Sequence, residues 1–471
     1  DSVFFTLTGA YTVTFGAPRC LNFTVSNGAP TFSSGSGSDF IVAGFVSFSS
    51  GTIFSITSNN FYVGGSFTLA AGVTYTSTAT LIFNSTVTGN TIITNGIAFN
   101  SPSYFEFNGN GGQWTLGGSF STNKGITITQ GTFNTGNYNL TATSLSSGGS
   151  LTRSINLGSS TITLQNISLT ATGLTFNAGT SNINFTPSSV TFNGGSFTFY
   201  NVNFTSTVVD SFFSITSPST FNNLTISGPA TIGQNYLSIN SPFTINGTFS
   251  TTGTAGNRRI WCLSGAAGDG LNRVITVNSA PSITDVDFQS IYFIGSATPI
   301  SGTRIGNRGF NYNINFDAPK IVYWNLAGAQ NWSANGWSDT PTGTPSTNFF
   351  PLPQDIAKFT DAGSVTGTIS LTGAFGYVST VDMSGRTSAM TLGLSAGQNV
   401  YGNWINGSGT TFTGTGYLQF SGGGIQTITS AGIAFPSQIG LSSWGGTLQL
   451  ADALITTSSI FVNYSTFDTK G

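Results

Sequence analysis

The sequence contains no histidine, only two cysteines and few charged residues, since Lys, Arg, Asp and Glu make up 6% of 471 residues. Ordinary globular proteins carry roughly a quarter charged residues. Without histidine, a Ser-His or Cys-His catalytic pair cannot form. The two distant cysteines, Cys20 and Cys262, can complete neither a zinc site nor a disulfide framework. We therefore expect two small buried cysteines, no cofactor and no enzymatic activity.

The scarcity of charge also limits the partners. The net charge is −2, which provides no basic surface for nucleic acid or anionic lipid. No apolar run reaches the roughly 18 to 20 residues that span a bilayer. We expect neither nucleic-acid binding nor membrane insertion. The sequence begins at Asp1 without a leader and stops within a repeat at Gly471, so we expect a processed or internal piece of a longer gene product.

The abundant residues are Gly, Ser, Thr, Asn and Phe, with 62 glycines and 41 phenylalanines. Disordered chains are poor in aromatic residues and rich in net charge, so this chain should fold with Phe as its main core residue. Segments such as Ile126-Thr127-Ile128 and Thr161-Ile162-Thr163-Leu164 alternate apolar and polar residues, which is typical of strands. Gly, Thr, Ser and Asn are poor helix formers. The sequence predicts an all-β protein.

Repeats favour one β architecture over the others. The tetrapeptide Gly-Gly-Ser-Phe begins at Gly64, Gly117 and Gly194, which suggests a coil of about 26 residues with three strands. Uncharged Ser, Thr and Asn suit stacked coils, where like charges would lie about 4.8 Å apart. We predict tandem modules of right-handed parallel β-helix, that is, β-solenoid. The alternative is a series of stacked β-sandwich modules.

A longer internal duplication organises the chain. Residues 91–99 resemble residues 427–435, residues 131–135 resemble residues 465–469, and Asp1–Phe5 resembles Asp355–Phe359. We predict four parts: a first solenoid module at 1–255, its end or cap at 256–320, a Trp- and Pro-rich joint at 321–354, and the start of a second module at 355–471.

The joint contains three tryptophans, Trp324, Trp332 and Trp337. They would cap the open end of one core, or their rings would stack on sugars. Arg304 and Arg308 precede the joint and belong with Arg258, Arg259 and Arg273 to the main arginine cluster. We predict that the three tryptophans, Arg304 and Arg308 make assembly, capping or glycan contacts.

Several motifs carry a resemblance. Tyr323-Trp324, Asn331-Trp332-Ser333, Trp337-Ser338 and then Asp355 with Phe359 resemble the module boundary of large repetitive β-rich proteins of bacterial surfaces and phage virion fibres. The run from Asn134 to Leu140 is similar to their β-helix repeat. The resemblance implies a fibrous or surface role and an extracellular, cell-surface or virion location. It carries over no catalytic residue.

Two patterns suggest chemistry. Asp285 and Asp287 alternate on a predicted strand, which would place two carboxylates on one face as a paired-acid site, a calcium contact, or a solvated turn or interface. Gly393-Leu394-Ser395-Ala396-Gly397 matches the nucleophile elbow, but without histidine it reduces to a turn between strands.

The sequence therefore predicts a structural subunit of an extracellular filament, cell-surface fibre or phage fibre or appendage. It would be non-catalytic and would self-associate by stacking of solenoids, whose exposed ends need a partner. The alternative is a carbohydrate-binding adhesin, or a polysaccharide depolymerase on a β-helix scaffold, with surface glycans as its partner.

Overall fold

The computed structural model describes residues 1–16, 18–34, 37–57, 59–206, 208–228, 233–253, 257–261, 273–371, 376–395 and 397–470. The chain divides into two compact units. The first comprises Asp1–Thr205 and Ile215–Leu224, and the second Ser206–Ser214 and Thr225–Gly471. Strands β27 (Phe212–Ile215) and β28 (Ser219–Ile226) contain residues of both units.

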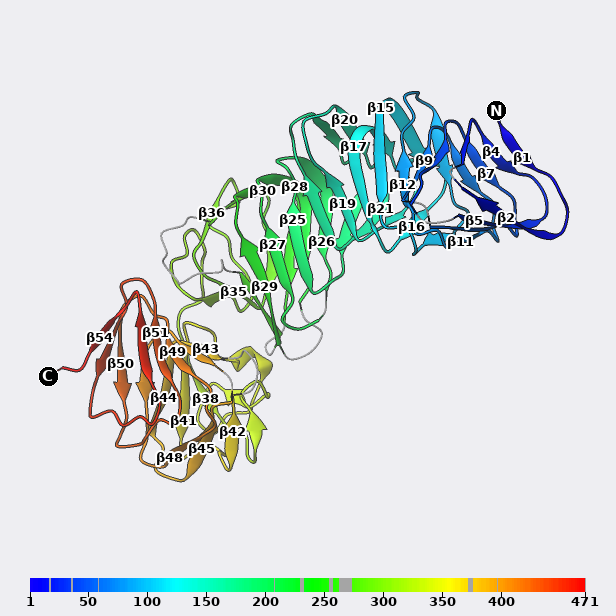
Figure 1. Cartoon of the computed structure of the whole chain (residues 1–471). Helices are drawn as coiled ribbons and strands as arrows, with labels where there is room; N and C mark the ends of the chain where they lie inside the picture. The colour runs from blue at the N-terminus through cyan, green and yellow to red at the C-terminus, as the bar shows by residue number, and fades with distance from the viewer. Residues whose placement is uncertain are drawn as a thin grey trace. The chain divides into compact units, whose positions relative to one another are not determined.

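The first unit is a stack of three-stranded coils, in which each strand pairs in parallel with the strand of the next coil (Figure 1). Three outer faces result. Face 1 consists of β3 (Arg19–Cys20), β6 (Phe40–Val42), β9 (Asn60–Val63), β12 (Thr80–Phe83), the first halves of β15 (Phe105–Leu116) and β17 (Gly125–Asn134), β19 (Ser144–Ser147), β22 (Asn166–Leu169) and β25 (Ser189–Asn193). Face 2 consists of β1 (Val3–Phe5), β4 (Phe23–Val25), β7 (Val46–Phe48), β10 (Phe67–Leu69), β13 (Asn90–Ile93), the second halves of β15 and β17, β20 (Arg153–Asn156) and β23 (Leu174–Asn177). Face 3 consists of β2 (Ala10–Phe15), β5 (Ala29–Ser34), β8 (Ile53–Ile56), β11 (Thr74–Tyr75), β14 (Ala98–Phe99), β16 (Phe120–Thr122), β18 (Leu140–Thr141), β21 (Thr161–Leu164), β24 (Asn182–Phe185) and β26 (Thr198–Phe204).

The second unit follows the same plan. Its first part contains β29 (Gly233–Ile239), β30 (Phe243–Ile245), β31 (Phe249–Thr252), β32 (Asn257–Trp261), β33 (Arg273–Val277), β34 (Ser282–Thr284), β35 (Val286–Phe288), β36 (Ile291–Ile294) and β37 (Gly306–Asn307). A second stack then forms three sheets, which are parallel apart from the pair β38–β40. The first sheet contains β38 (Ile321–Trp324), β40 (Trp337–Ser338), β41 (Ile356–Thr360), β44 (Thr380–Gly385), β47 (Trp404–Ile405), β50 (Ile425–Thr429), β52 (Thr447–Leu450) and β54 (Thr466–Asp468). The other two contain β39 (Gln330–Asn331), β42 (Thr368–Ser370), β45 (Met390–Gly393) and β48 (Thr410–Thr413), and β43 (Gly376–Val378), β46 (Gln398–Val400), β49 (Leu418–Phe420), β51 (Ile439–Ser442) and β53 (Ile460–Asn463).

These pairings confirm the predicted fold class. The chain forms a β-solenoid of about 20 turns, and its described strands pair in parallel, with β38 and β40 as an antiparallel exception. Parallel pairing between successive coils excludes the alternative of antiparallel sandwiches. Within the described residues the helical content is the 3-10 turn η1 (Thr347–Phe349), and no helix there is long and apolar enough to cross a membrane.

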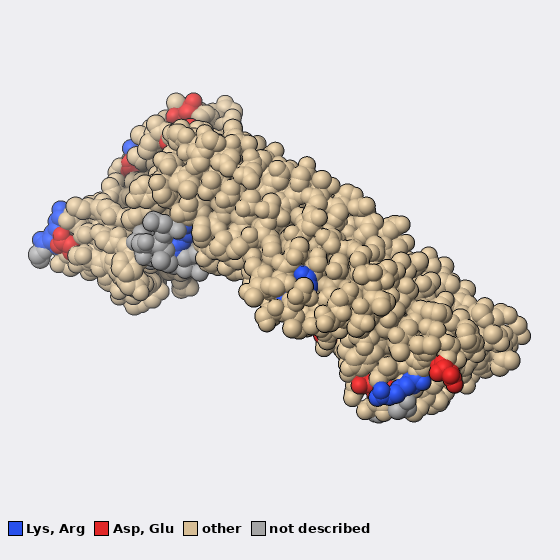
Figure 2. Space-filling model, turned by 90° about the horizontal axis from the view of Figure 1, so that it is seen from above, with Lys and Arg blue, Asp and Glu red and all other residues tan. Residues whose placement is uncertain are grey.

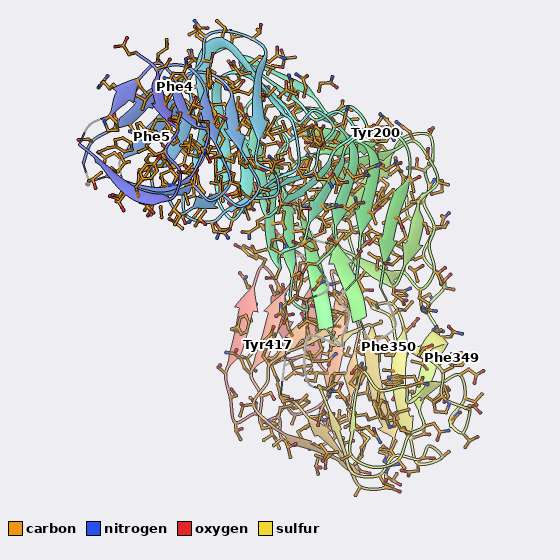
Figure 3. The ribbon with its side chains drawn as sticks, turned by 90° about the vertical axis from the view of Figure 1, so that its right-hand side faces the viewer. Phe4, Phe5, Tyr200, Phe349, Phe350 and Tyr417 are labelled. Carbon is orange, nitrogen blue, oxygen red and sulfur yellow. The ribbon has the colours of Figure 1, made fainter. Side chains whose placement is uncertain are left out.

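The alternation of residues in the sequence sorts the side chains. Phe4 points outward and is 62% exposed, whereas the ring of its neighbour Phe5 packs 4.9 Å from that of Phe32 (both Phe4 and Phe5 are labelled in Figure 3). Contacts between rings continue from coil to coil, for example from Phe40 to Phe61 at 4.9 Å. Each fully buried Phe contributes roughly 1.5 to 3 kcal/mol. Phe is therefore the main core residue, as predicted.

Asparagine ladders replace charge on the outer surface. Asn201 donates to Asn182 at 2.6 Å, and Asn223 donates to Asn201 at 2.7 Å, each bond joining successive coils on face 3. An amide both donates and accepts, so identical side chains can bond along a stack where identical charges would repel.

The coils vary in length, and many are shorter than the predicted 26 residues. Side-chain bonds between neighbouring coils span 19 residues at Asn182, 22 at Asn134 and 26 at Asn95. The Gly-Gly-Ser-Phe tetrapeptides do not mark equivalent positions either, because Gly64 precedes a face 2 strand and Gly117 precedes a face 3 strand. Their recurrence reflects composition, and the period inferred from them is wrong.

The longer duplication is confirmed in the backbone. Ile92 pairs with Leu116, and at the corresponding places Ile428 pairs with Leu450. The turn after each strand has the same left-handed pair of residues, with φ of 47° and 82° at residues 95 and 96, and 48° and 74° at residues 431 and 432. Both segments therefore form the same corner of a coil. The predicted module boundaries at 255, 320 and 354 remain predictions.

Candidate functional site: a buried charged cluster

The arginines and acids singled out in the sequence lie in the second unit around β35 and β37. Asp285 and Asp287 have no exposed surface, and Arg273 and Arg308 are 4% and 8% exposed. Charges are rarely buried unless they are paired, so this concentration is unusual for a chain with so few of them. The side chains of Arg258 and Arg259 lie outside those that the structure describes.

A bidentate ion pair joins two turns of this cluster. Arg304 donates from Nε to Asp285 Oδ1 at 2.8 Å and from Nη2 to Asp285 Oδ2 at 2.6 Å. Both residues have left-handed backbones, with φ of 50° and 54°. The hydrogen bonds to Asp285 raise the pKa of Arg304 further above its usual range, against a smaller opposing effect of burial. The third nitrogen, Nη1, reaches Asn348 Oδ1 in η1 at 2.9 Å.

The paired-acid and calcium interpretations of Asp285 and Asp287 do not suit this geometry. Asp285 precedes β35 in a left-handed conformation, so the two residues do not alternate along one straight strand. Both carboxylates are sealed from solvent, and both oxygens of Asp285 bond to a guanidinium. Within the described residues, no group of three or more His, Cys, Asp or Glu side chains is placed to hold a metal ion. Of the predicted roles, an internal interface agrees best with these contacts.

Arg308 makes the second connection. Its Nε donates to the Tyr401 hydroxyl at 2.6 Å, and its guanidinium lies 3.9 Å from the centre of the Tyr377 ring. Part of Tyr401 reaches solvent, but burial of its phenol raises the pKa, an effect that Arg308 opposes and the nearby Tyr377 and Asp287 reinforce. Arg308 thus ties the turn after β37 to the coils that contain β43 and β46.

The joint takes part in the same network. Gln354 accepts from Asn307 N at 2.9 Å and donates to Ile305 O at 3.1 Å. Lys320 Nζ donates to Asn348 O at 3.0 Å and lies 5.9 Å from the centre of the Phe349 ring (Figure 3). The cluster therefore fastens residues 285–308 to the joint and to the second stack within one unit.

The three joint tryptophans form a packed core. Trp324, Trp332 and Trp337 are each 1% exposed. The Trp337 ring lies 5.1 Å from Trp324 and 4.7 Å from Trp332, both edge to face, and 5.6 Å from Phe359. Buried rings present no face to a sugar, so packing is the predicted role that this geometry permits, and the glycan contact considered for them is not available here.

Sequence reasoning missed Tyr377, Tyr401, Asn348 and Gln354. The two tyrosines are about one coil apart in the chain, a signal that only the correct coil length would have revealed. Ser395 of the elbow pattern donates to Leu371 O at 3.2 Å, which is a bond between coils, and Ala396 lies outside the described residues. Cys20 is half-buried rather than buried, and desolvation raises the pKa of its thiol, while Cys262 lies outside the described residues.

The geometry defines a parallel β-solenoid in which several of the few charges are buried and fasten neighbouring coils. The outer surface in Figure 2 is correspondingly poor in charge, with Lys, Arg, Asp and Glu confined to a few spots on the face shown. Comparison with protein-family models, with curated proteins and with solved structures finds no match to this chain.

Proposed function

We propose that the protein is a non-catalytic structural subunit of an extracellular filament, a cell-surface fibre or a phage fibre or appendage. The observation that carries this proposal is the stacking itself. About 20 turns of parallel coil repeat one plan, and inward aromatic residues pack from one coil to the next. In such a repeat each coil is stabilised chiefly by its neighbours, so extension of the stack adds stability without a new fold.

The use of charge supports the same role. Arg153 is 2% exposed and donates to Leu151 O, Thr172 O and Thr170 O at 2.7, 3.0 and 3.0 Å. Arg386 is 3% exposed and donates to Thr360 O, Val365 O and Ala389 O at 3.2, 3.0 and 3.0 Å. In both cases a guanidinium satisfies turn carbonyls of adjacent coils. These arginines act as fasteners that resist local opening, which suits a load-bearing protein.

Self-association is the partner interaction that we propose. The charge-poor surface offers little electrostatic repulsion between copies, and amide and hydroxyl side chains can bond across a contact of like surfaces. The ends of a stack present backbone edges that pair readily with another strand.

Electron microscopy of negatively stained native material tests the structural role. We expect filaments, fibres or particle appendages in which the protein repeats along an axis, and resistance of the purified chain to limited proteolysis. Release of reducing sugars from surface polysaccharides by the purified protein would instead support a depolymerase. Dispersed monomers in native material together with such activity would overturn the structural proposal.

A further inference from the structure

One side of the first unit concentrates the few charges that this unit has. Its six charged residues are Asp1, Arg19, Asp39, Glu106, Lys124 and Arg153. Arg153 is buried. Arg19, Asp39 and Glu106 all lie on or directly beside the strands of face 1, and Lys124 immediately precedes its strand β17. Glu106 is also the only glutamate of the whole chain.

The register of face 1 places two tyrosines among these charges. Tyr62 pairs with Ile82, and Ile82 pairs with Glu106, so these three residues form one outward column across three coils. Asn60 pairs with Thr80 in the neighbouring column. Tyr104 continues that second column because it stands two residues before Glu106 on the same strand side, and it is 43% exposed.

Side chains of the neighbouring coils cover the outward side of β12. On β12 the inward residues Leu81 and Phe83 are fully buried, but the outward residues Thr80 and Ile82 are only 5% and 6% exposed as well. Outward residues on most other strands of this unit are partly or fully exposed. Tyr62, Tyr104 and Glu106 flank β12 in the coils on either side, so we attribute the cover over Ile82 to them.

The polar groups of the patch face one another. Partial burial raises the pKa of Tyr62, and so do the nearby charges of Asp39 and Glu106 and the phenol of Tyr104. Asn60 donates to Asp39 Oδ1 at 3.0 Å, and Thr129 donates to Glu106 Oε1 at 3.0 Å. Among the described residues, no side chain or backbone N–H donates to the second oxygen of either carboxylate. Each carboxylate therefore keeps an acceptor for a ligand.

We propose that this surface, the Tyr62 patch, formed by Asp39, Asn60, Tyr62, Tyr104 and Glu106, binds a neutral polysaccharide. Aromatic rings present apolar faces to the C–H side of a sugar, and carboxylate oxygens accept from its hydroxyl groups. The tyrosines lie two coil steps apart, with β12 between them, which is about 10 Å along the stack. That spacing suits successive sugars of a chain.

Within the patch, both charged groups are carboxylates, which would repel uronates or sulfated sugars, whereas uncharged hydroxyl groups satisfy them. The cations of face 1 lie outside the patch: Arg19 stands two coil steps beyond Tyr62 in the same column, and Lys124 precedes β17. The proposal is independent of the structural role, because a filament subunit with or without a glycan site would stack in the same way. The patch would bind a polysaccharide on the side of the stack, in addition to the self-association proposed above.

Affinity electrophoresis of the 471-residue chain in gels that contain dextran, galactomannan or mixed-linkage β-glucan tests the patch, with alginate as the polyanion. We expect retardation by at least one neutral polymer and none by alginate. Tyr104→Ala and Glu106→Gln should each weaken binding at least tenfold. The matched control is Tyr200→Ala, since Tyr200 is 37% exposed on β26 of face 3 (Figure 3) and should leave binding unchanged.

Hydroxyl-radical footprinting of the unmodified chain covers the case of a variant that fails to fold. With the retarding polysaccharide present, oxidation of Tyr62 and Tyr104 should fall while that of Tyr200 stays constant. Three outcomes overturn the proposal: none of the three neutral polymers binds, binding survives in a folded Tyr104→Ala/Glu106→Gln variant, or Tyr62 and Tyr104 gain no protection.

Discussion

The duplicated turn offers a reciprocal test of how this solenoid turns its corners. Asn95 and Ala431 occupy the same place with φ of 47° and 48°. A left-handed backbone costs an alanine roughly 1 to 2 kcal/mol, a cost that Asn partly escapes. Ala431→Asn should therefore stabilise its corner by about 0.5 to 1 kcal/mol. The backbone N–H of residue 431 donates to Asp452 Oδ2 at 2.8 Å, and this bond is kept because it does not involve the side chain.

Asn95→Ala should act in the opposite direction and more strongly. Asn95 Nδ2 donates to Leu69 O at 2.7 Å, a bond to the previous coil. Loss of that bond costs about 0.5 to 1.5 kcal/mol. Together with the 0.5 to 1 kcal/mol difference between Asn and Ala in a left-handed backbone, the total loss should be about 1 to 2.5 kcal/mol.

Native-state hydrogen exchange measures both effects locally, on peptides that cover residues 90–99 and 425–435. Exchange should slow in Ala431→Asn and accelerate in Asn95→Ala, each only near the altered corner. Ala434→Asn is the matched control, because Ala434 is exposed nearby without a left-handed backbone, and it should have no stabilising effect. Equal effects at positions 431 and 434, or faster exchange in Ala431→Asn, would refute the reasoning.

Three further predictions concern charged side chains that bond between coils. Arg153→Met should destabilise the first unit by about 3 to 5 kcal/mol, because turn carbonyls lose a buried cationic donor, whereas the exposed Arg19→Met should change the urea midpoint little. Arg304→Met should cost a comparable amount by removing the bidentate partner of Asp285, and Asp285→Asn in the same chain should restore part of it; an undiminished loss in the double variant would contradict the pairing argument. In the third case, bonds from Thr387 and Ser388 lower the pKa of Asp361, and bonds from Lys358 and Ser384 lower that of Asp382 against an opposing effect of burial. Their stabilisation is therefore complete above the unfolded pKa of about 4 and is lost as pH falls through the lower folded values. Melting of Asp361→Asn/Asp382→Asn should accordingly show a weaker pH dependence between pH 2 and 6 than the unaltered chain, and identical slopes would refute it.

Local patterns predicted the fold class because the alternation of apolar and polar residues directly determines which side of a strand faces the core. Alternation such as Thr161-Ile162-Thr163-Leu164 gives one inward and one outward side, and the structure places Ile162 and Leu164 in the core. The duplication around Phe99 and Phe435 was detectable because both rings are fully buried at the same corner. Both the alternation and the duplication can be recognised from adjacent residues or from two similar segments of the sequence.

The cluster around Arg304 and Arg308 could be anticipated only in part. The concentration of arginine was visible, but the partners lie far along the chain, as with Tyr401, 93 residues from Arg308. The coil length decides which residues stack on one another. The period inferred from Gly-Gly-Ser-Phe did not match the actual coil lengths, so these partners were not recognised. Positive φ at Asp285 also cannot be recognised from two acids with one residue between them, so an expected strand became a turn. These contacts were missed because they depend on the register between coils, which cannot be read directly from the order of the residues.

The scarcity of charge on the outer surface has a consequence for how copies would meet. Electrostatic steering can raise association rates by orders of magnitude and is weakened by salt. A chain with a net charge of −2 and four buried arginines, Arg153, Arg273, Arg308 and Arg386, has little such steering. Its encounters should depend on diffusion and on the fit of short-range contacts, so we expect any assembly to proceed at nearly the same rate in fresh water and in sea-strength salt.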